Sequence, residues 1–488
     1  MKPNILCIVM DDLRADFLSA FGGPAPETPH MDRMVERGCT FRNQFVTTPI
    51  CTPGRAELLT GCRSWRNGVP WFQIPIDSGC ALLPRVMCDA GYHTVHVGKW
   101  HNDGHPKDRG YTRTRRVFTR DCLWRRDNHY AAWKENGKIV SGHTTELYVD
   151  AALEEIEGAP QDRPWFTWLA PTAPHDPFLC PEPFQSMYDD RLPPLPDALM
   201  PAHPFETGDL TIRDETLLPW PRDPEVVRRY RARYWAIITH LDYHLGRLFD
   251  RLEATGRMDD TIVVITGDHG LSVGDHGLLG KSNMYDHSCR VPATFVGPGV
   301  PRGTETFGLT ASADLMPTLC ALAEVEAPSD LEGRAVLGTE GVQNLREEIV
   351  CQMHTPSDRG RRERLGIADD DPRCRPIPDD AENTLGWDIL WDTQRCIRTD
   401  THKLHWYPLI GRFQLFDLQD DPHEKHDMLR TTWLHPGTWV RNKMGLPESS
   451  DVLGVAADLR ERLVAFLDDQ HDACVQSLRE QPIPEETP

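Results

Sequence analysis

The chain has 488 residues, of which 39% are hydrophobic and 26% are charged, and its formal net charge is -21. These values indicate a globular protein with an ample buried core and exclude a disordered chain, and no apolar stretch approaches the length that spans a bilayer. So acidic a chain also argues against binding to the phosphate backbone of nucleic acids. Neither nucleic acid nor a membrane is therefore expected as a partner.

The 14 cysteines are scattered without a paired spacing such as Cys-x-x-Cys, which argues against a zinc ribbon and against a disulfide scaffold. The first residues lead straight into a short apolar run, and no small-residue cleavage site follows it. The sequence therefore predicts a cytoplasmic, reduced protein, although a removed leader would leave no trace. It gives no indication of the oligomeric state.

The first expected element is a strand over residues 5–10, a continuous apolar run that is typical of a strand buried on both faces of a parallel sheet. Asp11 and Asp12 follow it directly. Open α/β sheets carry their sites at the carboxyl ends of the central strands. Two adjacent carboxylates at this place favour a pair of metal ligands over a solvated turn.

A helix is predicted over residues 28–37 and a strand over residues 40–46, and the strand leads to the segment Cys51-Thr52-Pro53-Gly54-Arg55. The residues from Ala56 onward are expected to form the first turn of a helix. A thiol at a helix N-terminus beside an arginine lies where positive potential stabilises an anion. A buried structural thiol explains this segment at least as well.

Two further strands, predicted over residues 94–97 and 165–170, also end in polar side chains. Lys99 and His101 follow the first strand, although on their own they are more simply explained as a polar loop. His175 follows the second strand between prolines, which hold it in a stiff extended loop. The alternative for this histidine is an ordinary place in a turn.

The strand predicted over residues 261–266 repeats the pattern of the first strand and ends in Asp268 and His269. With the acid pair of the first strand, these side chains make a mainly oxygen ligand set that is suited to one divalent cation. Lys281 follows in a Gly-Lys pair and returns a second cation toward the same place.

Three segments lack a hydrophobic periodicity that would indicate a helix or a strand. Residues 102–142 are polar, basic and aromatic, which suits an anionic or sugar-like ligand, such as one with a second anionic group, but equally suits a solvated insertion. Residues 181–224 are proline-rich and are expected to form a wall over the site before a long helix over residues 225–252. Residues 355–382 are expected to be an exposed insertion.

These motifs, in this order, resemble those of the type I, formylglycine-dependent sulfatases of the alkaline phosphatase-like superfamily. The shared patterns are Cys-x-Pro-x-Arg, the double aspartate, Gly-Lys-x-His, Pro-His and Gly-Asp-His-Gly, and the resemblance runs from Pro3 to about Asp427. It implies a doubly wound, mostly parallel α/β sheet with helices on both faces. The catalytic domain would span residues 1–350, and a smaller subdomain with antiparallel strands and a terminal helix would span residues 351–488.

In this family the cysteine of the motif is oxidised after translation to formylglycine, so a formylglycine-generating enzyme is the expected maturation partner. The resemblance implies that the hydrated aldehyde, held on the cation, attacks the sulfur of a sulfate ester and then collapses to expel sulfate. The cation is expected to be Ca²⁺, with Mn²⁺ or Mg²⁺ left open by the imidazole in the set. The implied metal ligands are Asp11, Asp12, Cys51, Asp268 and His269.

The substrate implied by the resemblance is a small-molecule or saccharide sulfate ester. Lys99, His175 and Lys281 would bind it and neutralise charge on the transferring group, with Lys281 or His175 protonating the leaving oxygen. His101 would act as the base in the second step, and Arg55 would hold the diol. The implied catalytic residues are thus Cys51, Arg55, Lys99, His101, His175 and Lys281.

Two other functions stay open. Many sulfatases have asparagine where this chain has His269, and the histidine form is shared with phosphonate monoester hydrolases. A phosphonate monoester or phosphodiester hydrolase that uses the same site is therefore the alternative. A catalytically inactive protein that binds anionic ligands is the third, although every expected catalytic position is filled.

Overall fold

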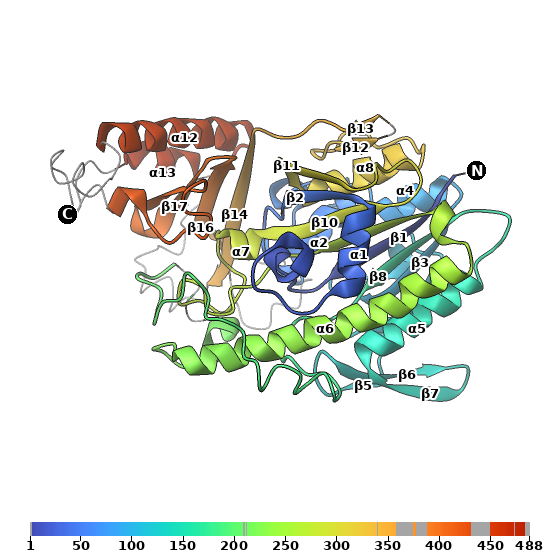
Figure 1. The fold of residues 1–488 in the computed structure, drawn as a ribbon. Coiled ribbons are helices and arrows are strands. Elements are labelled where there is room, and N and C mark those ends of the chain that lie inside the picture. Colours follow the sequence, from blue (N-terminus) through green and yellow to red (C-terminus); the bar gives the residue numbers. More distant parts are fainter. Residues whose placement is uncertain are drawn as a thin grey trace.

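The computed structural model describes residues 2–207, 210, 212–338, 340–357, 374–376, 388–430, 449–472 and 474–483. Its largest feature is an eight-stranded sheet with the order β11-β2-β10-β9-β1-β8-β3-β4 (Figure 1). Within it, β10 runs antiparallel to both of its neighbours and every other adjacent pair is parallel. The strands are β1 (Asn4–Met10), β2 (Cys39–Phe45), β3 (His93–Lys99), β4 (Arg113–Phe118), β8 (Trp165–Ala170), β9 (Thr261–Gly267), β10 (Arg290–Val296) and β11 (Thr304–Ala311).

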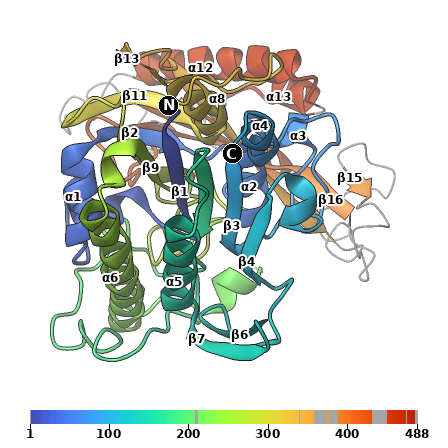
Figure 2. The ribbon, with the colours of Figure 1, turned by 90° about the vertical axis from the view of Figure 1, so that its right-hand side faces the viewer.

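Helices cover both faces of this sheet, as the views in Figures 1 and 2 show. Successive side chains of a strand point to opposite faces. Accordingly, Leu6 and Ile8 of β1 pack in the core under one set of helices, and Ile5 and Cys7 pack in the core under the other. The first set is α1 (Pro29–Arg37), α5 (Thr144–Glu157) and α6 (Pro224–Ala254), and the second is α2 (Cys51–Thr60), α4 (Leu83–Asp89) and α8 (Leu315–Leu322). The predicted doubly wound architecture is confirmed.

Helix α2 begins at Cys51 itself, whereas the sequence placed its first turn from Ala56. Pro53 does not prevent this, because the first N–H groups of a helix have no partner within the helix. Every residue of α2 is buried. The motif is therefore built into a core helix whose N-terminus faces the edge of the sheet.

The basic segment over residues 102–142 is more ordered than its composition suggested. It supplies the edge strand β4 and a separate antiparallel sheet of β5 (Trp124–Arg125), β6 (Tyr130–Glu135) and β7 (Lys138–His143). Arg115 and Arg116 both pair with Glu135, and Arg115 also pairs with Glu155. Charged side chains are a usual device of edge strands. These two arginines thus serve the fold, and the hint of an anionic ligand in this segment loses their support.

A five-stranded antiparallel sheet, which we call the second sheet, follows with the order β14-β16-β17-β18, and β15 pairs with β16. The sequence predicted antiparallel strands in this part of the chain, and the hydrophobic core of the sheet is shared with a long helix. The elements are β14 (Glu348–Ser357), β15 (Cys374–Pro376), β16 (Asp388–Thr399), β17 (His402–Tyr407), β18 (Arg412–Asp417), α12 (Ser449–Asp469) and α13 (Val475–Glu480).

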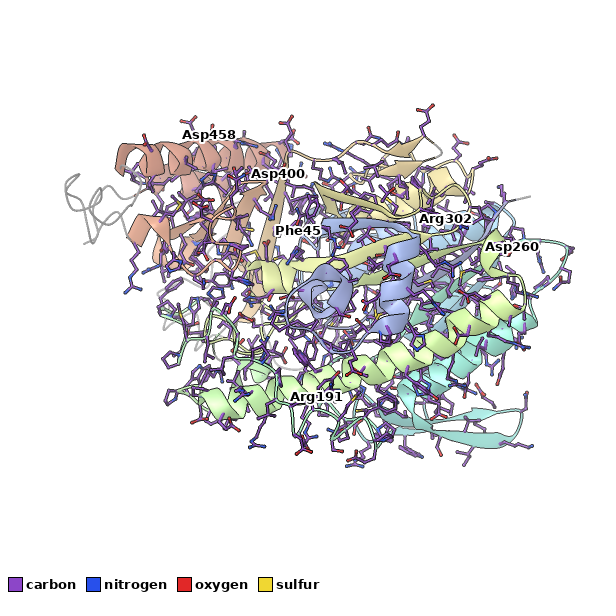
Figure 3. All side chains as sticks on the ribbon, viewed as in Figure 1. Phe45, Arg191, Asp260, Arg302, Asp400 and Asp458 are labelled. Carbon is purple, nitrogen blue, oxygen red and sulfur yellow. The ribbon has the colours of Figure 1, made fainter. Side chains whose placement is uncertain are left out.

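The two sheets share a hydrophobic contact. Phe45 at the end of β2, labelled in Figure 3, packs in one cluster with Ile349 and Met353 of β14. The boundary at residue 350 therefore stays a prediction, and most of the insertion expected over residues 355–382 lies outside the described residues.

Among the described helices, none combines the length and the apolar character needed to cross a bilayer. The remaining short α-helices and strands of the described residues are α3 (Ser64–Asn67), α7 (Asp286–Cys289), β12 (Leu337–Gly338) and β13 (Gly341–Val342).

Candidate active site

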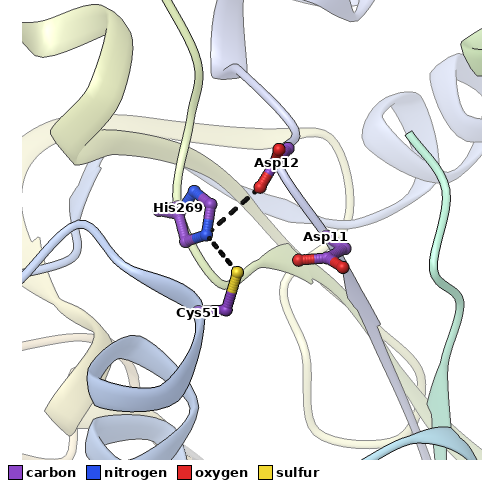
Figure 4. Close-up of side chains that lie close together, drawn as sticks. All are labelled: Asp11, Asp12, Cys51 and His269. Atoms are coloured by element: carbon purple, nitrogen blue, oxygen red, sulfur yellow. Dashed lines mark hydrogen bonds and ion pairs between the residues drawn. The ribbon is translucent and has the colours of Figure 1, made fainter. Parts of the chain in front are cut away.

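The predicted site residues meet at the carboxyl edge of the large sheet. Asp11 and Asp12 leave the end of β1, His269 follows β9, and Cys51 begins α2 opposite them (Figure 4). Lys99 ends β3, and His175 follows β8 after a short loop. The buried members of this group are Asp11, Asp12, Cys51, Arg55, Lys99, His175, Asp268, His269 and Lys281.

Two backbone features bring the thiol and the carboxylates together. Asp12 has a φ of 67°, in the left-handed region, so the chain turns sharply where β1 ends. A Cβ atom on Gly54 would lie 2.3 Å from the carbonyl oxygen of Asp268. Only a glycine allows α2 to approach the end of β9 this closely.

The centre of the site is a compact group of potential metal ligands. His269 Nε2 lies 3.1 Å from Cys51 Sγ and 3.2 Å from Asp12 Oδ1. Ligand atoms of the whole group lie within 4.8 Å of one another, and Asp11 Oδ1 has no hydrogen-bond partner among the described residues. Buried carboxylates with an open oxygen beside an imidazole fit one divalent cation. The group is Asp11, Asp12, Cys51 and His269.

Asp268 lies next to this group. Its Oδ1 accepts a hydrogen bond from the backbone N–H of Asp12 at 3.2 Å and lies 3.6 Å from His269 Nε2. Burial raises the pKa of Asp268 to about 7, although His269 and Arg55 act to lower it. A cation beside this carboxylate would favour its ionised form.

Each carboxylate of the site has a cation of its own. Arg55 Nε lies 2.9 Å from Asp268 Oδ2, and Lys99 pairs with Asp11. Burial alone would raise the pKa of Asp11, as would Cys51, but Lys99 and other cations outweigh both effects and lower it to about 2. The positive charges of neighbouring side chains therefore balance the inner carboxylates.

A third ion pair, between Lys281 and Asp12, also reaches His175 and so joins the two flanks of the site. Lys281 Nζ lies 3.0 Å from Asp12 Oδ1 and 3.2 Å from His175 Nε2. Asp12, His175 and Asp176 offer a second set of ligand atoms within 4.8 Å of one another. The ammonium of Lys281 already contacts two members of this set, so among the described residues the group that includes Cys51 is the better candidate for a metal ion.

The surroundings of the Cys51 thiol lower its pKa and so favour the thiolate. Burial would raise its pKa, but Lys281, Lys99 and His269 lower it well below the usual value, helped by a hydrogen bond from His101. Burial and the nearby Lys99 lower the pKa of His101 to about 4, so this imidazole is neutral at pH 7. Its backbone carbonyl accepts a hydrogen bond from Thr52 at 2.9 Å. His101 is thus available as a proton acceptor beside Cys51.

Several residues around His175 were not identified from the sequence. Asp176 Oδ1 lies 3.1 Å from His175 Nδ1, and the side chain of Asn128 lies 2.9 Å from the same nitrogen. Asp176 could have been found, because it directly follows His175. Asn128 carried no such signal, since it lies between β5 and β6 and reaches the site only through the fold.

The proline-rich segment also reaches the site through a 3-10 helix, η4 (Arg213–Thr216). Arg213 pairs with Asp176, and Asp214 Oδ2 lies 3.5 Å from Lys281 Nζ. The sequence predicted a wall here but no particular residue. The structure therefore brings together every predicted site residue, while the roles assigned to them stay predictions.

Comparison with known proteins adds to this geometry. A family model described as Sulfatase matches residues 3–325. A multifunctional alkaline phosphatase superfamily protein, PehA of Trinickia caryophylli, is 29% identical over 394 residues, which cover 69% of this chain and 76% of that protein. An N-acetylglucosamine-6-O-sulfatase of Bacteroides thetaiotaomicron is 24% identical over 497 residues, which cover 88% of this chain and 82% of that protein.

Two solved structures show the same fold. BT4656, in complex with its substrate D-glucosamine-2-N,6-O-disulfate, has a TM-score of 0.72 at 21% identity, and the match covers 100% of both chains. The phosphonate monoester hydrolase of Agrobacterium radiobacter has a TM-score of 0.74 at 21% identity, and the match covers 96% of both chains.

Proposed function

Because the chain belongs to the sulfatase family, we propose that it hydrolyses an organic sulfate ester and releases inorganic sulfate. The observation that carries this proposal is the position of Cys51, whose sulfur lies 3.1 Å from His269 Nε2 at the edge of a buried carboxylate cluster. Lys99 and Lys281 lower the pKa of the same thiol, so both lie where a transferring sulfuryl group would need positive charge. A carbohydrate substrate is supported by the relative named as an N-acetylglucosamine-6-O-sulfatase.

Two groups would complete the site. Conversion of Cys51 to formylglycine by a formylglycine-generating enzyme would supply, once hydrated, an oxygen nucleophile and a second hydroxyl to drive release. One divalent cation, Ca²⁺ by the predominance of carboxylate oxygens, would supply positive charge that acidifies the nucleophile. The side chains that would hold it are Asp11, Asp12, Asp268, His269 and the modified residue 51.

The other side chains of the site would take roles that follow from their positions. Lys281 Nζ and His175 Nε2 are 3.2 Å apart, so both can reach the same leaving oxygen, and one of them would protonate it. Lys99 would bind a sulfuryl oxygen on the other flank. His101 hydrogen-bonds to the Cys51 sulfur, which places it to take the proton of the second hydroxyl. Arg55 holds Asp268 in place through its Nε.

A phosphonate monoester or phosphodiester hydrolase is the second candidate. The observation that favours it is His269, an imidazole at a position where many sulfatases have an amide. The likeness to a phosphonate monoester hydrolase extends over the fold at a TM-score of 0.74. The same cations and the same nucleophile would serve this reaction.

Paired kinetics distinguish the two candidates. The enzyme would be co-expressed with a formylglycine-generating enzyme, and conversion of Cys51 would be verified by mass spectrometry. We expect a higher kcat/KM for p-nitrophenyl sulfate than for p-nitrophenyl phenylphosphonate. The reverse preference would establish the second candidate. Both would be ruled out if fully converted enzyme hydrolysed neither of these esters and also released no sulfate from glucose 6-sulfate and cyclohexylmethyl sulfate.

A further inference from the structure

The 3-10 helix η4 is fixed against the site by buried contacts. Glu215 accepts hydrogen bonds from the backbone N–H groups of Leu279 and Gly280, at 2.9 Å and 2.7 Å. The same carboxylate pairs with Arg222 at 2.8 Å, and both side chains are almost fully buried. Buried hydrogen bonds therefore join the segment that leads into Lys281 to η4.

Two neighbouring residues of η4, Arg213 and Asp214, extend toward the site. We call them the η4 pair. Asp214 Oδ2 lies 3.5 Å from Lys281 Nζ, and Arg213 forms an ion pair with Asp176, which contacts His175. The side chain of Arg213 is 59% exposed, whereas that of Lys281 is 5% exposed. The η4 pair thus lies outside the cations of the inner site.

The η4 pair lies on the side of the site where the leaving group of the substrate would extend. Lys281 and His175 are the residues that would hold the leaving oxygen, so this inference rests on the proposed function. Groups attached to that oxygen extend outward from the inner site. Among the residues that the structure describes, the η4 pair lies on this flank, in contact with Lys281 and Asp176.

The charges of the η4 pair indicate what it can bind. Arg213 pairs with two carboxylates, those of Asp176 and Asp214, so its positive charge is already balanced. A second anionic group on the substrate would gain little there, because it would have to displace one of these carboxylates from Arg213. A guanidinium beside a carboxylate instead offers N–H donors and oxygen acceptors side by side, which match the hydroxyl groups of a polyol.

We propose that Arg213 and Asp214 are specificity-determining residues that bind hydroxyl groups of an uncharged, polyhydroxylated leaving alcohol. Arg213 donates hydrogen bonds to hydroxyl oxygens of a sugar ring, and Asp214 accepts from a neighbouring hydroxyl. The substrate class is then a sulfate ester of a neutral sugar, and not one that carries a uronate or a second sulfate on this flank.

The test compares two esters with similarly basic leaving groups. Glucose 6-sulfate and cyclohexylmethyl sulfate both release a primary alcohol and need comparable protonation of the leaving oxygen, but only the first carries ring hydroxyls. We expect the wild-type enzyme to favour glucose 6-sulfate in kcat/KM. In Arg213→Gln and in Asp214→Asn, the ratio of the two kcat/KM values should fall by about tenfold or more, as expected for lost hydrogen bonds to charged groups.

A matched control is Arg191→Gln. Arg191, labelled in Figure 3, is 55% exposed and pairs with Glu27, which is not a residue of the site. Its substitution should leave the ratio unchanged. An equal loss for both esters in the η4 variants would overturn the assignment, because it would show that they act only by orienting His175 or Lys281. A wild-type preference for cyclohexylmethyl sulfate would overturn it as well.

The proposed function fails by a different outcome. If fully converted wild-type enzyme released no sulfate from p-nitrophenyl sulfate, glucose 6-sulfate or cyclohexylmethyl sulfate, the sulfatase activity itself would be disproved, and this inference with it. Activity on p-nitrophenyl sulfate with no fall in the ratio for either variant would overturn the η4 assignment alone.

Discussion

Cys51 shows how much of the site depends on one side chain. Its sulfur is buried, its pKa is lowered well below the usual value, and it belongs to the group of potential metal ligands. A serine at this position keeps an oxygen nucleophile but has no second hydroxyl on the same carbon. It could accept a sulfuryl group once, but it could not expel it by collapse to an aldehyde.

We therefore expect Cys51→Ser to lose steady-state turnover by about a thousandfold or more, as is usual when a nucleophile is removed. Intact-mass spectrometry should detect a sulfate adduct on this variant or no reaction at all. Cys51→Ala should be inactive with an unchanged unfolding midpoint, which separates chemistry from folding. Multiple turnovers by Cys51→Ser at the rate of the converted enzyme would contradict the proposed mechanism.

Gly54 tests the backbone approach that positions this thiol. In Gly54→Ala the new Cβ would lie 2.3 Å from the carbonyl oxygen of Asp268, so α2 and the end of β9 must separate. We expect a loss of about 1–3 kcal/mol in the free energy of unfolding, typical of overpacking, together with a lower kcat/KM. Urea unfolding and kinetics on p-nitrophenyl sulfate would measure both.

The control for Gly54 is another helical glycine. A Cβ on Gly454 in α12 would meet no atom within 4 Å. Gly454→Ala should therefore stabilise the protein by about 0.5–1 kcal/mol, the difference in helix propensity, without affecting kinetics. Equal effects of the two substitutions would show that the approach of α2 to β9 is not tight.

At the scale of single residues, a member of the candidate site was predictable only where it follows a strand that the hydrophobic pattern predicts or lies in a sequence motif. Asp11, Asp12 and Asp268 follow apolar strands, and such strand ends meet at one edge of a parallel sheet. Asn128 and Asp214 come from irregular segments, where no period tells which side chain turns inward. Their contacts depend on tertiary packing that a local pattern does not contain.

At the scale of elements, α2 is held in place by a buried acid. Glu57 accepts hydrogen bonds from the N–H of Thr47 and the N–H of Ala313, at 3.0 Å and 3.2 Å. Burial raises the pKa of Glu57 to about 7, although the hydrogen bonds from Thr47 act to lower it. The unfolded chain would have the ordinary value of 4.5.

The sign of the pH dependence follows from these two values. Because the folded pKa of Glu57 is the higher one, its contribution to stability is present in full below pH 4.5 and is lost as the pH rises to about 7. Between these limits the free energy of unfolding of the wild type, relative to Glu57→Gln, should fall by about 3 kcal/mol. Urea unfolding of both proteins from pH 4.5 to 8 measures this difference, and parallel curves would contradict it.

Elements with a clear hydrophobic periodicity were predicted well, whereas a strand whose side chains form ion pairs was not. The apolar runs of β1, β8 and β9 and the long amphipathic helix α6 lie close to their predicted bounds. Strand β4 was missed because its arginines conceal an edge strand whose charges are paired with glutamates of other elements. Its place in the sheet depends on partners that lie far away in the sequence.

At the scale of the whole molecule, the order of the motifs was enough to identify the family, the enzyme class and the doubly wound fold, all of which are confirmed. How the second sheet is fixed to the first was not predictable. A buried ion network provides part of this connection. Lys403 of β17 contacts Asp286 at 2.7 Å and Glu424 at 2.9 Å, and Glu424 also accepts the backbone N–H of Asp286.

Asp286 begins α7, which directly follows the segment of Lys281 and lies between the two sheets (Figure 1). Burial would lower the pKa of Lys403, but Asp286 and Glu424 raise it well above the usual value, so the ammonium stays charged. Lys403→Met would leave two buried carboxylates without this partner. We expect a loss of about 3–5 kcal/mol in the free energy of unfolding.

The same substitution should also weaken catalysis, because α7 and the Lys281 segment would lose an anchor. We expect Lys403→Met to have a lower kcat/KM on p-nitrophenyl sulfate than the wild type, under conditions where the variant is still folded. Lys425→Met is the matched control, since Lys425 is exposed and close to the network in sequence. It should change neither stability nor kinetics. If Lys403→Met were as stable and as active as this control, the network would have no part in joining the second sheet to the site.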